Sequence, residues 1–360
     1  MNARIPKKTL VDGLALLEHI IPTRSSNPIL TYLPLELGKK GLLLRGTNGE
    51  VDLEASLPAE ITGEQLALVP AQLFFQIVRN APGELIEMSF GDKLSLASGS
   101  FKTELALASP EGYPELAFQE SKNERISARE LTRAILRVRY AASLEEYRAI
   151  FRGVQLEFSP AGLRAVASDG FRLARFDLAA PSPQPRKIVV PARAADEIVR
   201  VFKDLEGELE IAASEHSLTL VGPAARMTAK LMEGQFPDYQ RVIPQQFVLE
   251  ASLQAEALRE SLKRVSVLSD RSNHRVNLIF REDQLEINAE SESGRGGEEL
   301  SVNTSGTLPL EAAYNAQYLI DALAPVSGTV NLKLSGPTNP SVIQAAEDSG
   351  YLAVVVPLRV

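Results

Sequence analysis

The chain of 360 residues contains one passage three times, and this repetition restricts its possible folds more than any other feature. Asn48-Gly49 and Asp169-Gly170 lie 121 positions apart, and Pro70 and Pro191, each opening a helical pattern, have the same separation. Both dipeptides favour tight type I′ hairpins, because the central residues of such turns take positive φ. The sequence therefore predicts a unit of about 120 residues that is built three times.

Each copy combines two amphipathic helices with alternating strands. The apolar stripes of the first helices are Leu10, Leu14, Leu17 and Ile21; Leu131, Ala134, Ile135, Val138 and Ala142; and Leu258, Leu262 and Val265. Second helices are expected over residues 69–79, 190–200 and 314–323, and paired strands over 209–213 with 217–221 and 330–334 with 342–345. The glycine-rich segment 294–299 is expected to form a mobile hairpin tip.

This order of elements predicts an α+β fold of three similar domains, each with two helices packed on an antiparallel sheet. Boundaries are expected where polar or proline-containing stretches separate the copies, giving domains 1–122, 123–246 and 247–360. Edge strands at the two ends would remain free. A head-to-tail contact between such edges closes into a ring when the rotation suits.

Composition excludes several classes of protein. The chain has no cysteine, which rules out disulfides, thiol nucleophiles and thiolate metal sites. It also lacks a run of 18 apolar residues or a signal-like apolar segment near Met1, so we expect a cytoplasmic protein without a membrane partner. The net charge of -8 means that any contact with DNA must come from a local basic face.

No constellation of residues indicates catalysis. His19, His216 and His274 occur singly, and no glycine motif of the phosphate-binding kinds follows a strand. We therefore expect no catalytic residue, no metal and no cofactor. Two other classes stay open: a hydrolase with an unrecognised site, and a repeat scaffold that binds proteins but not DNA.

One predicted helix carries a basic stripe. Arg129, Arg133 and Arg137 recur every four residues on the helix expected over 128–142, roughly opposite its apolar face. That helix holds four arginines against the single acid Glu130, in a chain that is acidic overall. Most such stripes are solvated faces, but this asymmetry is also the sign of a surface that faces DNA.

Three segments carry a resemblance to a known family: SDGFRLA at 168–174, GQFPDYQRVIP at 234–244 and VVVPLRV at 354–360. In this order, on a triplicated chain of this length, they closely resemble the bacterial replicative DNA sliding clamp, the beta subunit of DNA polymerase III. The resemblance covers essentially the whole chain. It implies a non-catalytic homodimeric ring around double-stranded DNA, which tethers the replicative polymerase and recruits the clamp loader and repair proteins through short peptides.

The resemblance also implies a peptide pocket between the second and third domains, with Arg172 and Arg241 at its rim. Its expected residues are Phe151, Ser168, Gly170, Phe171, Arg172, Leu173, Pro237, Arg241, Val242, Asn315, Tyr318, Val354, Val356, Pro357, Leu358 and Arg359. Phe171 stands where the family often has histidine, and Val356 and Leu358 stand where methionines are frequent. A less pliable pocket is therefore expected, and its peptide preference stays open.

Each of these segments also has a plainer interpretation. Ser168-Asp169-Gly170 is first of all a turn, and residues 354–360 could be a last strand with a frayed end. The aromatic Phe171 directly after the turn favours a binding surface, and apolar Leu358 and Val360 beyond Pro357 favour a docked tail.

The resemblance assigns further residues to the DNA and to the partner copy. Those expected to face DNA are Arg24, Arg79, Arg129, Arg133, Arg137, Arg200, Lys203 and Lys263, although Arg24 could equally belong to a plain surface loop. Those expected at the dimer interface are Leu105, Val267 and Leu268. The tightness of ring closure and the way the ring opens stay open.

Overall fold

The computed structural model describes residues 1–39, 41–120 and 124–359. They form two compact units, Met1–Arg129 with Asp196–Leu231 and Glu130–Ala195 with Met232–Val360. The predicted boundary between 122 and 123 lies outside the described residues. The second repeat contributes to both units, so the compact units cut the chain differently from the predicted domains.

Two antiparallel sheets build the first unit. The five-stranded sheet has the order β5 (Glu60–Thr62), β1 (Asn2–Pro6), β7 (Leu85–Phe90), β8 (Lys93–Ser98) and β9 (Phe101–Ala106). The eight-stranded sheet has the order β10 (Arg125–Ser127), β15 (Glu208–Ala213), β16 (Ser217–Val221), β17 (Ala225–Lys230), β4 (Val51–Leu57), β3 (Gly41–Thr47), β2 (Tyr32–Gly38) and β6 (Gln65–Pro70).

Two further antiparallel sheets build the second unit. The nine-stranded sheet has the order β14 (Arg186–Pro191), β11 (Gly153–Ser159), β12 (Gly162–Ser168), β13 (Arg172–Leu178), β26 (Tyr351–Val355), β25 (Ser341–Ala345), β24 (Thr329–Leu334), β18 (Leu249–Gln254) and β22 (Asn303–Gly306). The four-stranded sheet has the order β21 (Gly294–Ser301), β20 (Gln284–Ser291), β19 (Arg275–Arg281) and β23 (Leu310–Asn315).

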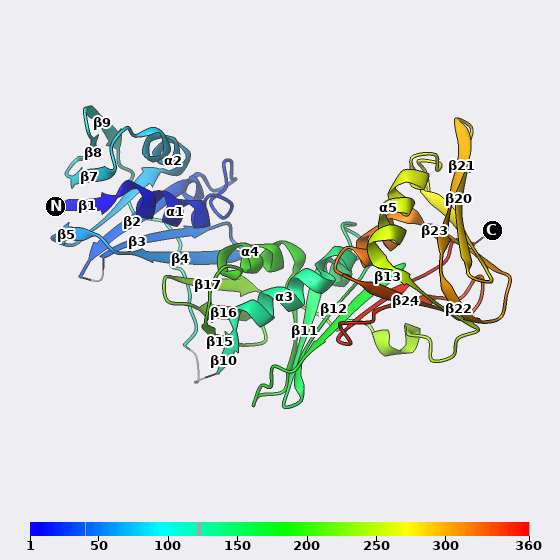
Figure 1. Ribbon diagram of the computed structural model, residues 1–360. Coiled ribbons are helices and arrows are strands. Elements are labelled where there is room, and N and C mark those ends of the chain that lie inside the picture. Colours follow the sequence, from blue (N-terminus) through cyan, green and yellow to red (C-terminus); the bar gives the residue numbers. More distant parts are fainter. Residues whose placement is uncertain (40, 121–123, 360) are drawn as a thin grey trace. The chain divides into compact units, whose positions relative to one another are not determined.

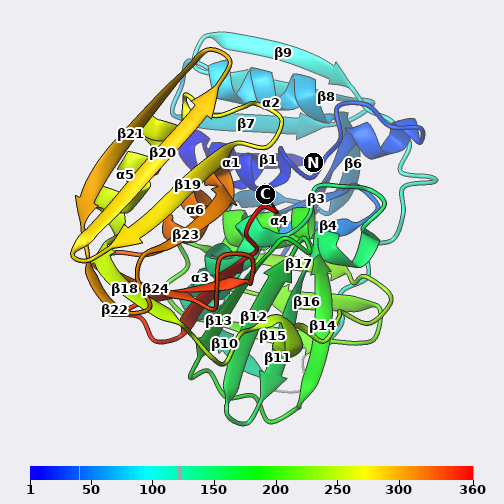
Figure 2. The ribbon, with the colours of Figure 1, turned by 90° about the vertical axis from the view of Figure 1, so that its right-hand side faces the viewer.

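The helices bury the apolar stripes that the sequence predicts. They are α1 (Lys7–Leu17), α2 (Ala71–Asn80), α3 (Ala128–Val138), α4 (Ala192–Phe202), α5 (Ala255–Ser266) and α6 (Ala316–Leu323). Leu10, Leu14 and Leu17 are buried on α1, which packs on β3 and β4. Helix α5 runs beside β20 and β21 (Figure 1), and Figure 2 shows β19, β20 and β21 side by side. The prediction of two helices on antiparallel strands is confirmed.

Two helices end earlier than their apolar stripes suggest. Helix α1 stops at Leu17, although Ile21 is buried beyond it. Helix α3 stops at Val138 and continues as the 3-10 helix η2 (Arg139–Ala141), so the prediction of a helix to residue 142 is wrong. The spacing of apolar residues reports which positions are buried, not which are helical. A buried apolar residue just after a helix therefore extends the apparent helical pattern.

Both predicted hairpins form, but not with type I′ turns. Gly49 and Gly170 have positive φ, of 88° and 89°, whereas Asn48 and Asp169 do not. Their side chains bind the turn instead: Asn48 Oδ1 accepts from the backbone N of Glu50 and Val51, at 2.9 and 2.8 Å. An Asx side chain that bonds its own backbone makes a second positive φ unnecessary.

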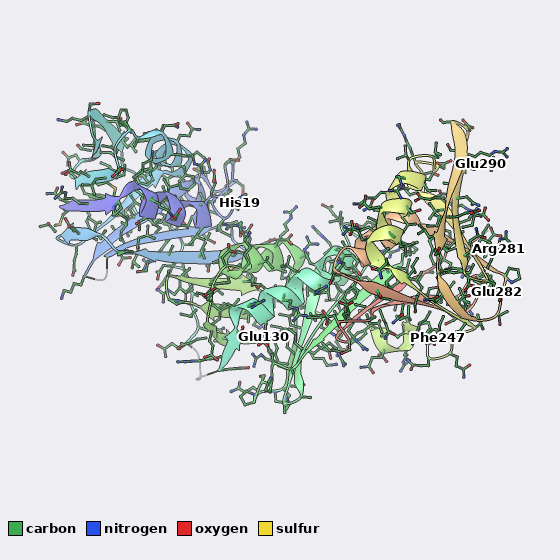
Figure 3. All side chains as sticks on the ribbon, in the orientation of Figure 1. His19, Glu130, Phe247, Arg281, Glu282 and Glu290 are labelled. Carbon is green, nitrogen blue, oxygen red and sulfur yellow. The ribbon has the colours of Figure 1, made fainter. Side chains whose placement is uncertain are left out.

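The segment 294–299 is not a hairpin tip, contrary to the prediction. It begins β21, which pairs with β20 from Ser291 opposite Gly294 to Gln284 opposite Ser301. A Cβ on Gly296 would lie 2.6 Å from Cδ1 of Leu268, so any other residue there requires the Leu268 side chain to move. In Figure 3 the labelled Arg281 and Glu282 mark one end of the β19–β20 hairpin, and Glu290 lies toward the other end of β20.

Main-chain hydrogen bonds join one repeat to the next. Strand β17 of the second repeat pairs with β4 of the first, and β26 of the third pairs with β13 of the second. We call the β4–β17 region the first junction and the β13–β26 region the second junction. In the sheets that the structure describes, β9 and β21 lie at free ends, as expected for the edge strands.

Glu54 of β4 lies between two arginines in the first junction. Its Oε2 accepts from Arg45 Nε at 2.7 Å and from Arg226 Nη2 at 2.9 Å, and its side chain is 8% exposed. Burial acts to raise the pKa of Glu54, but the hydrogen bonds from Arg226 and Arg45 outweigh burial and hold the pKa below its ordinary value of 4.5.

We expect Glu54→Gln to lower stability at neutral pH by roughly 1–3 kcal/mol, because two arginines lose a carboxylate partner. The folded-state pKa of Glu54 is lowered, so its contribution to stability is complete above about pH 4.5 and is lost as the pH falls through the folded-state pKa. The variant should therefore lose less stability than the parent on acidification. Circular dichroism melts at a series of pH values check this, with the exposed Glu60→Gln as the control that should leave both the melting temperature and its pH dependence unchanged.

Candidate partner-binding site

The first predicted segment forms the turn between β12 and β13. Ser168 Oγ accepts from Gly170 N at 3.1 Å and donates to the carbonyl oxygen of Arg172 at 2.8 Å. Asp169 Oδ1 accepts from the backbone N of Phe171 and Arg172, at 2.8 and 2.9 Å. The turn is rigid because its polar groups bond one another, and it leaves Phe171 48% exposed at its tip. A fixed and exposed aromatic is a good anchor for a partner.

Arg172 links this turn to helix α6. Its guanidinium pairs with Asp169 Oδ2 at 3.0 Å and with Asp321 Oδ2 at 2.5 Å, and its Cζ lies 4.6 Å from the ring centre of Tyr318. The side chain of Arg172 is 13% exposed. Two carboxylates and an aromatic ring therefore hold the guanidinium of Arg172 mostly inside the protein, and its place at the rim of a peptide pocket stays a prediction.

Arg148 lies over the exposed aromatic. Its Cζ is 4.8 Å from the ring centre of Phe171 and 5.6 Å from that of Tyr147. Its Nη1 donates to the carbonyl oxygen of Asp169, and its Nε lies 3.5 Å from Glu145 Oε2. Arg148 therefore adds a cation to the surface that Phe171 presents.

The tail after β26 docks onto the turn and onto β23. Val356 N donates to the carbonyl oxygen of Phe171 at 2.9 Å, and Leu358 N donates to that of Ala313 at 2.7 Å. Pro357 is buried, Val356 and Leu358 are half-buried, and Arg359 is exposed. The prediction of a docked tail is confirmed for residues 356–358. Val360, on which the prediction also rested, lies outside the described residues.

The segment 234–244 reaches the same surface through a buried apolar cluster. Tyr239 lies in the 3-10 helix η4 (Tyr239–Val242), and its hydroxyl donates to Glu157 Oε1 at 3.0 Å. The cluster consists of Val166, Leu173, Tyr239, Ile243, Val342, Leu352 and Val354. Phe236 and Phe247, of which Phe247 is labelled in Figure 3, pack against it. Leu173 comes from the turn segment and Val354 from the tail segment, so the cluster unites all three segments.

The other predicted residues surround this cluster. Phe151, in the 3-10 helix η3 (Ala149–Arg152), packs edge-on against Phe236 with 5.9 Å between ring centres. Asn315 caps α6 by accepting from Gln317 N at 2.9 Å. Pro237, Arg241 and Val242 are exposed, and Arg241 pairs with Asp238 of its own segment at 2.8 Å.

The sequence interpretation missed residues that hold this surface together. Asp321 and Arg148 contact Arg172 and Phe171, and Tyr140 shares a hydrogen bond of 2.7 Å with Tyr351 beneath Arg172. Burial raises the pKa of both tyrosines, so they stay neutral. For Asp321, the available signal was its spacing of three residues from Tyr318 on the same predicted helix. No local pattern marks Arg148.

Two arginines of the basic stripe on α3 form ion pairs within the second unit. Arg133 Nη2 and Arg137 Nη2 lie 2.8 and 3.2 Å from Asp348 Oδ2, and both guanidiniums lie over the ring of Phe176, at 5.0 and 5.6 Å. Their charges are thus partly balanced before any phosphate approaches. Arg129 lies in the first turn of the same helix, which begins at Ala128.

The remaining residues expected to face DNA differ in their surroundings. Arg79 pairs with Glu18 at 2.7 Å, and this hydrogen bond lowers the pKa of Glu18. Arg200 donates to the carbonyl oxygens of Ala15 and Leu16, at 2.8 and 2.5 Å, and so ties α4 to the end of α1. Arg24 and Lys203 are exposed, and Lys263 pairs with Glu260 at 2.7 Å.

The residues expected at the dimer interface lie at or near the free edges. Leu105 belongs to the edge strand β9, but its side chain is 4% exposed and faces the core. Val267 follows α5 and is 81% exposed, and Leu268 packs beside Gly296 of the edge strand β21. Of these three residues, Val267 therefore leaves the most apolar surface exposed.

Family models of the DNA polymerase III beta subunit match nearly the whole chain. The N-terminal domain model matches residues 1–117, the central domain model 125–238 and the C-terminal domain model 240–359. The chain belongs to the DNA polymerase III beta subunit family. Its three-part sequence repetition corresponds to these three models.

Individual sliding clamps agree with this assignment. A beta sliding clamp of Pseudomonas putida is 30% identical over the full length of both chains. A crystal structure of a sliding clamp from Pseudomonas aeruginosa bound to griselimycin has a TM-score of 0.95 and 27% identity over both full chains. The beta subunit of Thermotoga maritima has a TM-score of 0.93 and 26% identity, covering 100% of this chain and 99% of its own.

Membership of this family makes the chain a DNA sliding clamp of replication, which is a processivity factor and not an enzyme. Among the described residues, no group of three or more His, Cys, Asp or Glu side chains is arranged to hold a metal ion. None of the described helices has the length and apolar character that a membrane crossing requires.

Proposed function

We propose that two copies of this sliding clamp close head-to-tail into a ring around double-stranded DNA, and that each copy binds partner peptides at the second junction. The observation that carries the peptide site is the convergence of the turn, η4 and the tail on one buried cluster. The partners proposed are the replicative polymerase, the clamp loader and repair proteins. A chromosomal DNA partner implies the cytoplasm as the location.

The chemistry of the second junction suits a peptide with apolar anchors. Phe171 and Val242 are about half exposed, and each lies in a segment that also contributes residues to the buried apolar cluster. A large apolar side chain of a peptide would gain free energy by covering them. Arg148 lies beside Phe171 with guanidinium N–H groups that suit a peptide carbonyl or a glutamine oxygen. Small anchors on a rigid surface typically give micromolar affinity, which lets partners exchange on one ring.

A comparison of DNA topologies tests the ring itself. The protein, once loaded, should remain on nicked circular DNA and leave the same DNA after linearisation, because a closed ring slides off an end. Gel filtration measures the retention. A scaffold that binds only proteins would be retained on neither DNA. Equal retention on circular and linear DNA would contradict encirclement.

Neutralising Arg129, Arg133 and Arg137 together should weaken retention on DNA of every sequence and flatten its salt dependence. Contacts limited to phosphates release counterions and read no bases, so the slope of log affinity against log salt should fall by about one per lost contact. Because Asp348 balances two of these arginines, we expect less than the full loss of three. Fluorescence anisotropy on two unrelated duplexes at several salt concentrations measures this.

Arg281→Gln is the matched control, because it removes an exposed cation on β19. It should leave the salt slope unchanged. A triple variant that alters sequence preference would show that the stripe reads bases, and the sliding proposal would then fail.

A further inference from the structure

One acidic side chain bridges two arginines of the stripe on α3. Asp348 Oδ2 lies 2.8 Å from Arg133 Nη2 and 3.2 Å from Arg137 Nη2. Both guanidiniums also lie over the buried ring of Phe176, with their Cζ atoms 5.0 and 5.6 Å from its centre. A single carboxylate oxygen thus joins two cations that lie over the same aromatic ring.

The main chain positions Asp348 for this contact. Asp348 belongs to the connection 346–350 between β25 and β26, in which Tyr351 N donates to the carbonyl oxygen of Asp348 at 3.1 Å. Asp177 N of β13 donates to the carbonyl oxygen of Gly350 at 3.0 Å, and a Cβ on Gly350 would clash with the carbonyl oxygen of Asp177. The connection is therefore closely packed on β13, and it presents the carboxylate of Asp348 to α3.

Helix α3 has other anchors than this ion pair. Its apolar residues, such as Leu131, are fully buried, and Tyr140 just beyond the helix shares a hydrogen bond of 2.7 Å with Tyr351. The side chains of Arg133 and Asp348 are 45% and 23% exposed, and an ion pair in contact with solvent adds little to stability. Stability alone therefore does not account for an acid at position 348.

The arrangement is that of a phosphate site with a carboxylate in the place of the phosphate. Guanidinium groups bind carboxylate and phosphate oxygens with the same planar fork of N–H donors. Because the side chain of Arg133 is 45% exposed, a DNA phosphate can approach the guanidinium that Asp348 holds. Two arginines that share one carboxylate carry one net positive charge, whereas without it they would carry two.

We infer that Asp348 is an internal substitute for a DNA phosphate, and that by holding Arg133 and Arg137 it keeps the attraction between α3 and DNA weak. This inference rests on the proposed contact of α3 with DNA. A cation that binds a phosphate releases counterions from the DNA, and a carboxylate that already holds the cation competes with that binding. A sliding clamp has to exchange one phosphate for the next as it moves, which a weak contact that reads no bases permits.

Asp348→Asn tests this competition, because it removes the charge and keeps the size of the side chain. We expect the slope of log affinity against log salt to steepen by about 0.9, and the affinity for a duplex of about 30 base pairs to rise roughly fivefold to tenfold at about 0.1 M salt, since one more phosphate contact becomes available. Fluorescence anisotropy over a series of salt concentrations measures both quantities. If this variant does not fold, as judged by circular dichroism, Asp348→Ser replaces it with the same expectation.

Glu347→Gln is the matched control. It removes the same charge from the same connection, where Glu347 is exposed and, within the described part of the chain, forms no ion pair with Arg133 or Arg137. The affinity should change by less than about twofold, because salt screens an exposed charge that touches neither arginine. Equal effects of Asp348→Asn and Glu347→Gln, or weaker DNA binding by Asp348→Asn, overturn the inference.

A background without the two arginines separates competition from a general effect of charge. The variant R133Q/R137Q should have a shallower salt slope than the parent, and adding Asp348→Asn to it should change the affinity no more than Glu347→Gln does in the parent. A larger gain in this background would show that Asp348 acts without the arginines, and the inference would fail. If R133Q/R137Q keeps the slope of the parent, the proposed contact of α3 with DNA is itself wrong, and the inference falls with it.

Discussion

Deleting residues 357–360 should abolish binding of a fluorescein-labelled peptide that contains a glutamine, two leucines and a phenylalanine, while the dimer and its retention on circular DNA persist. The deletion removes the buried Pro357 and the hydrogen bond from Leu358 N to the carbonyl oxygen of Ala313, and it leaves the β13–β26 pairing intact. The surface beside Phe171 then loses Pro357 and Leu358, which with Val356 form one of its walls. Because hydrophobic anchors need that wall, we expect affinity to fall at least 100-fold, or about 2.7 kcal/mol. Fluorescence polarisation measures the loss.

A shorter deletion of residues 359–360 is the matched control. It keeps Leu358 and its hydrogen bond to Ala313, and it removes the exposed Arg359. Binding should change by less than about threefold, since an exposed charge contributes little. Undiminished binding by the longer deletion would mean that the tail is only a strand end, and the site assignment would fail.

Val267→Lys should convert the dimer into a monomer at micromolar concentration. Val267 is 81% exposed in the single chain, so lysine there costs the folded chain almost nothing. If a second copy covers this position, the change buries an ammonium without a partner, at a cost of several kcal/mol before relaxation. Multi-angle light scattering over a range of concentrations measures the shift.

Leu268→Lys should have the same effect on the dimer, with an added loss of stability because Leu268 packs beside Gly296. Val248→Lys is the control, since Val248 is another exposed apolar residue, away from β9 and β21. It should leave the dimer intact. A parent protein that is monomeric at micromolar concentration would contradict the head-to-tail proposal before any variant is made.

Local patterns in the sequence were sufficient to predict the elements. In the first two copies a proline precedes the second helix: Pro70 and Pro191 mark where α2 and α4 begin one residue later. Apolar periodicity identified the buried faces of α3 and α5, because burial alone sets that spacing. The turn at Ser168 and the docking of Leu358 were predictable from the types of residue within each short segment.

Contacts between distant residues were beyond such patterns. Nothing near residue 54 indicates that β4 pairs with β17, or that Arg226 neutralises Glu54. The same holds for Asp348, which balances Arg133 and Arg137 of a helix more than 200 positions earlier. The glycines of 294–299 predict a flexible tip, whereas the segment lies in β21 with Leu268 packed beside Gly296. Charge partners and space requirements are properties of the assembled fold.

The pairing of β13 with β26 also governs when the partner surface can come into existence during synthesis. The wall beside Phe171 is made by residues 356–358, which leave the ribosome long after the turn at Ser168. Until then β13 has an open edge and the cluster residues Leu173 and Val166 lack their partners Leu352 and Val354. Contacts of such large sequence separation form slowly, and a nascent chain keeps the incomplete edge exposed. Under the proposed function, the site for a partner peptide is therefore complete only once β26 has paired with β13.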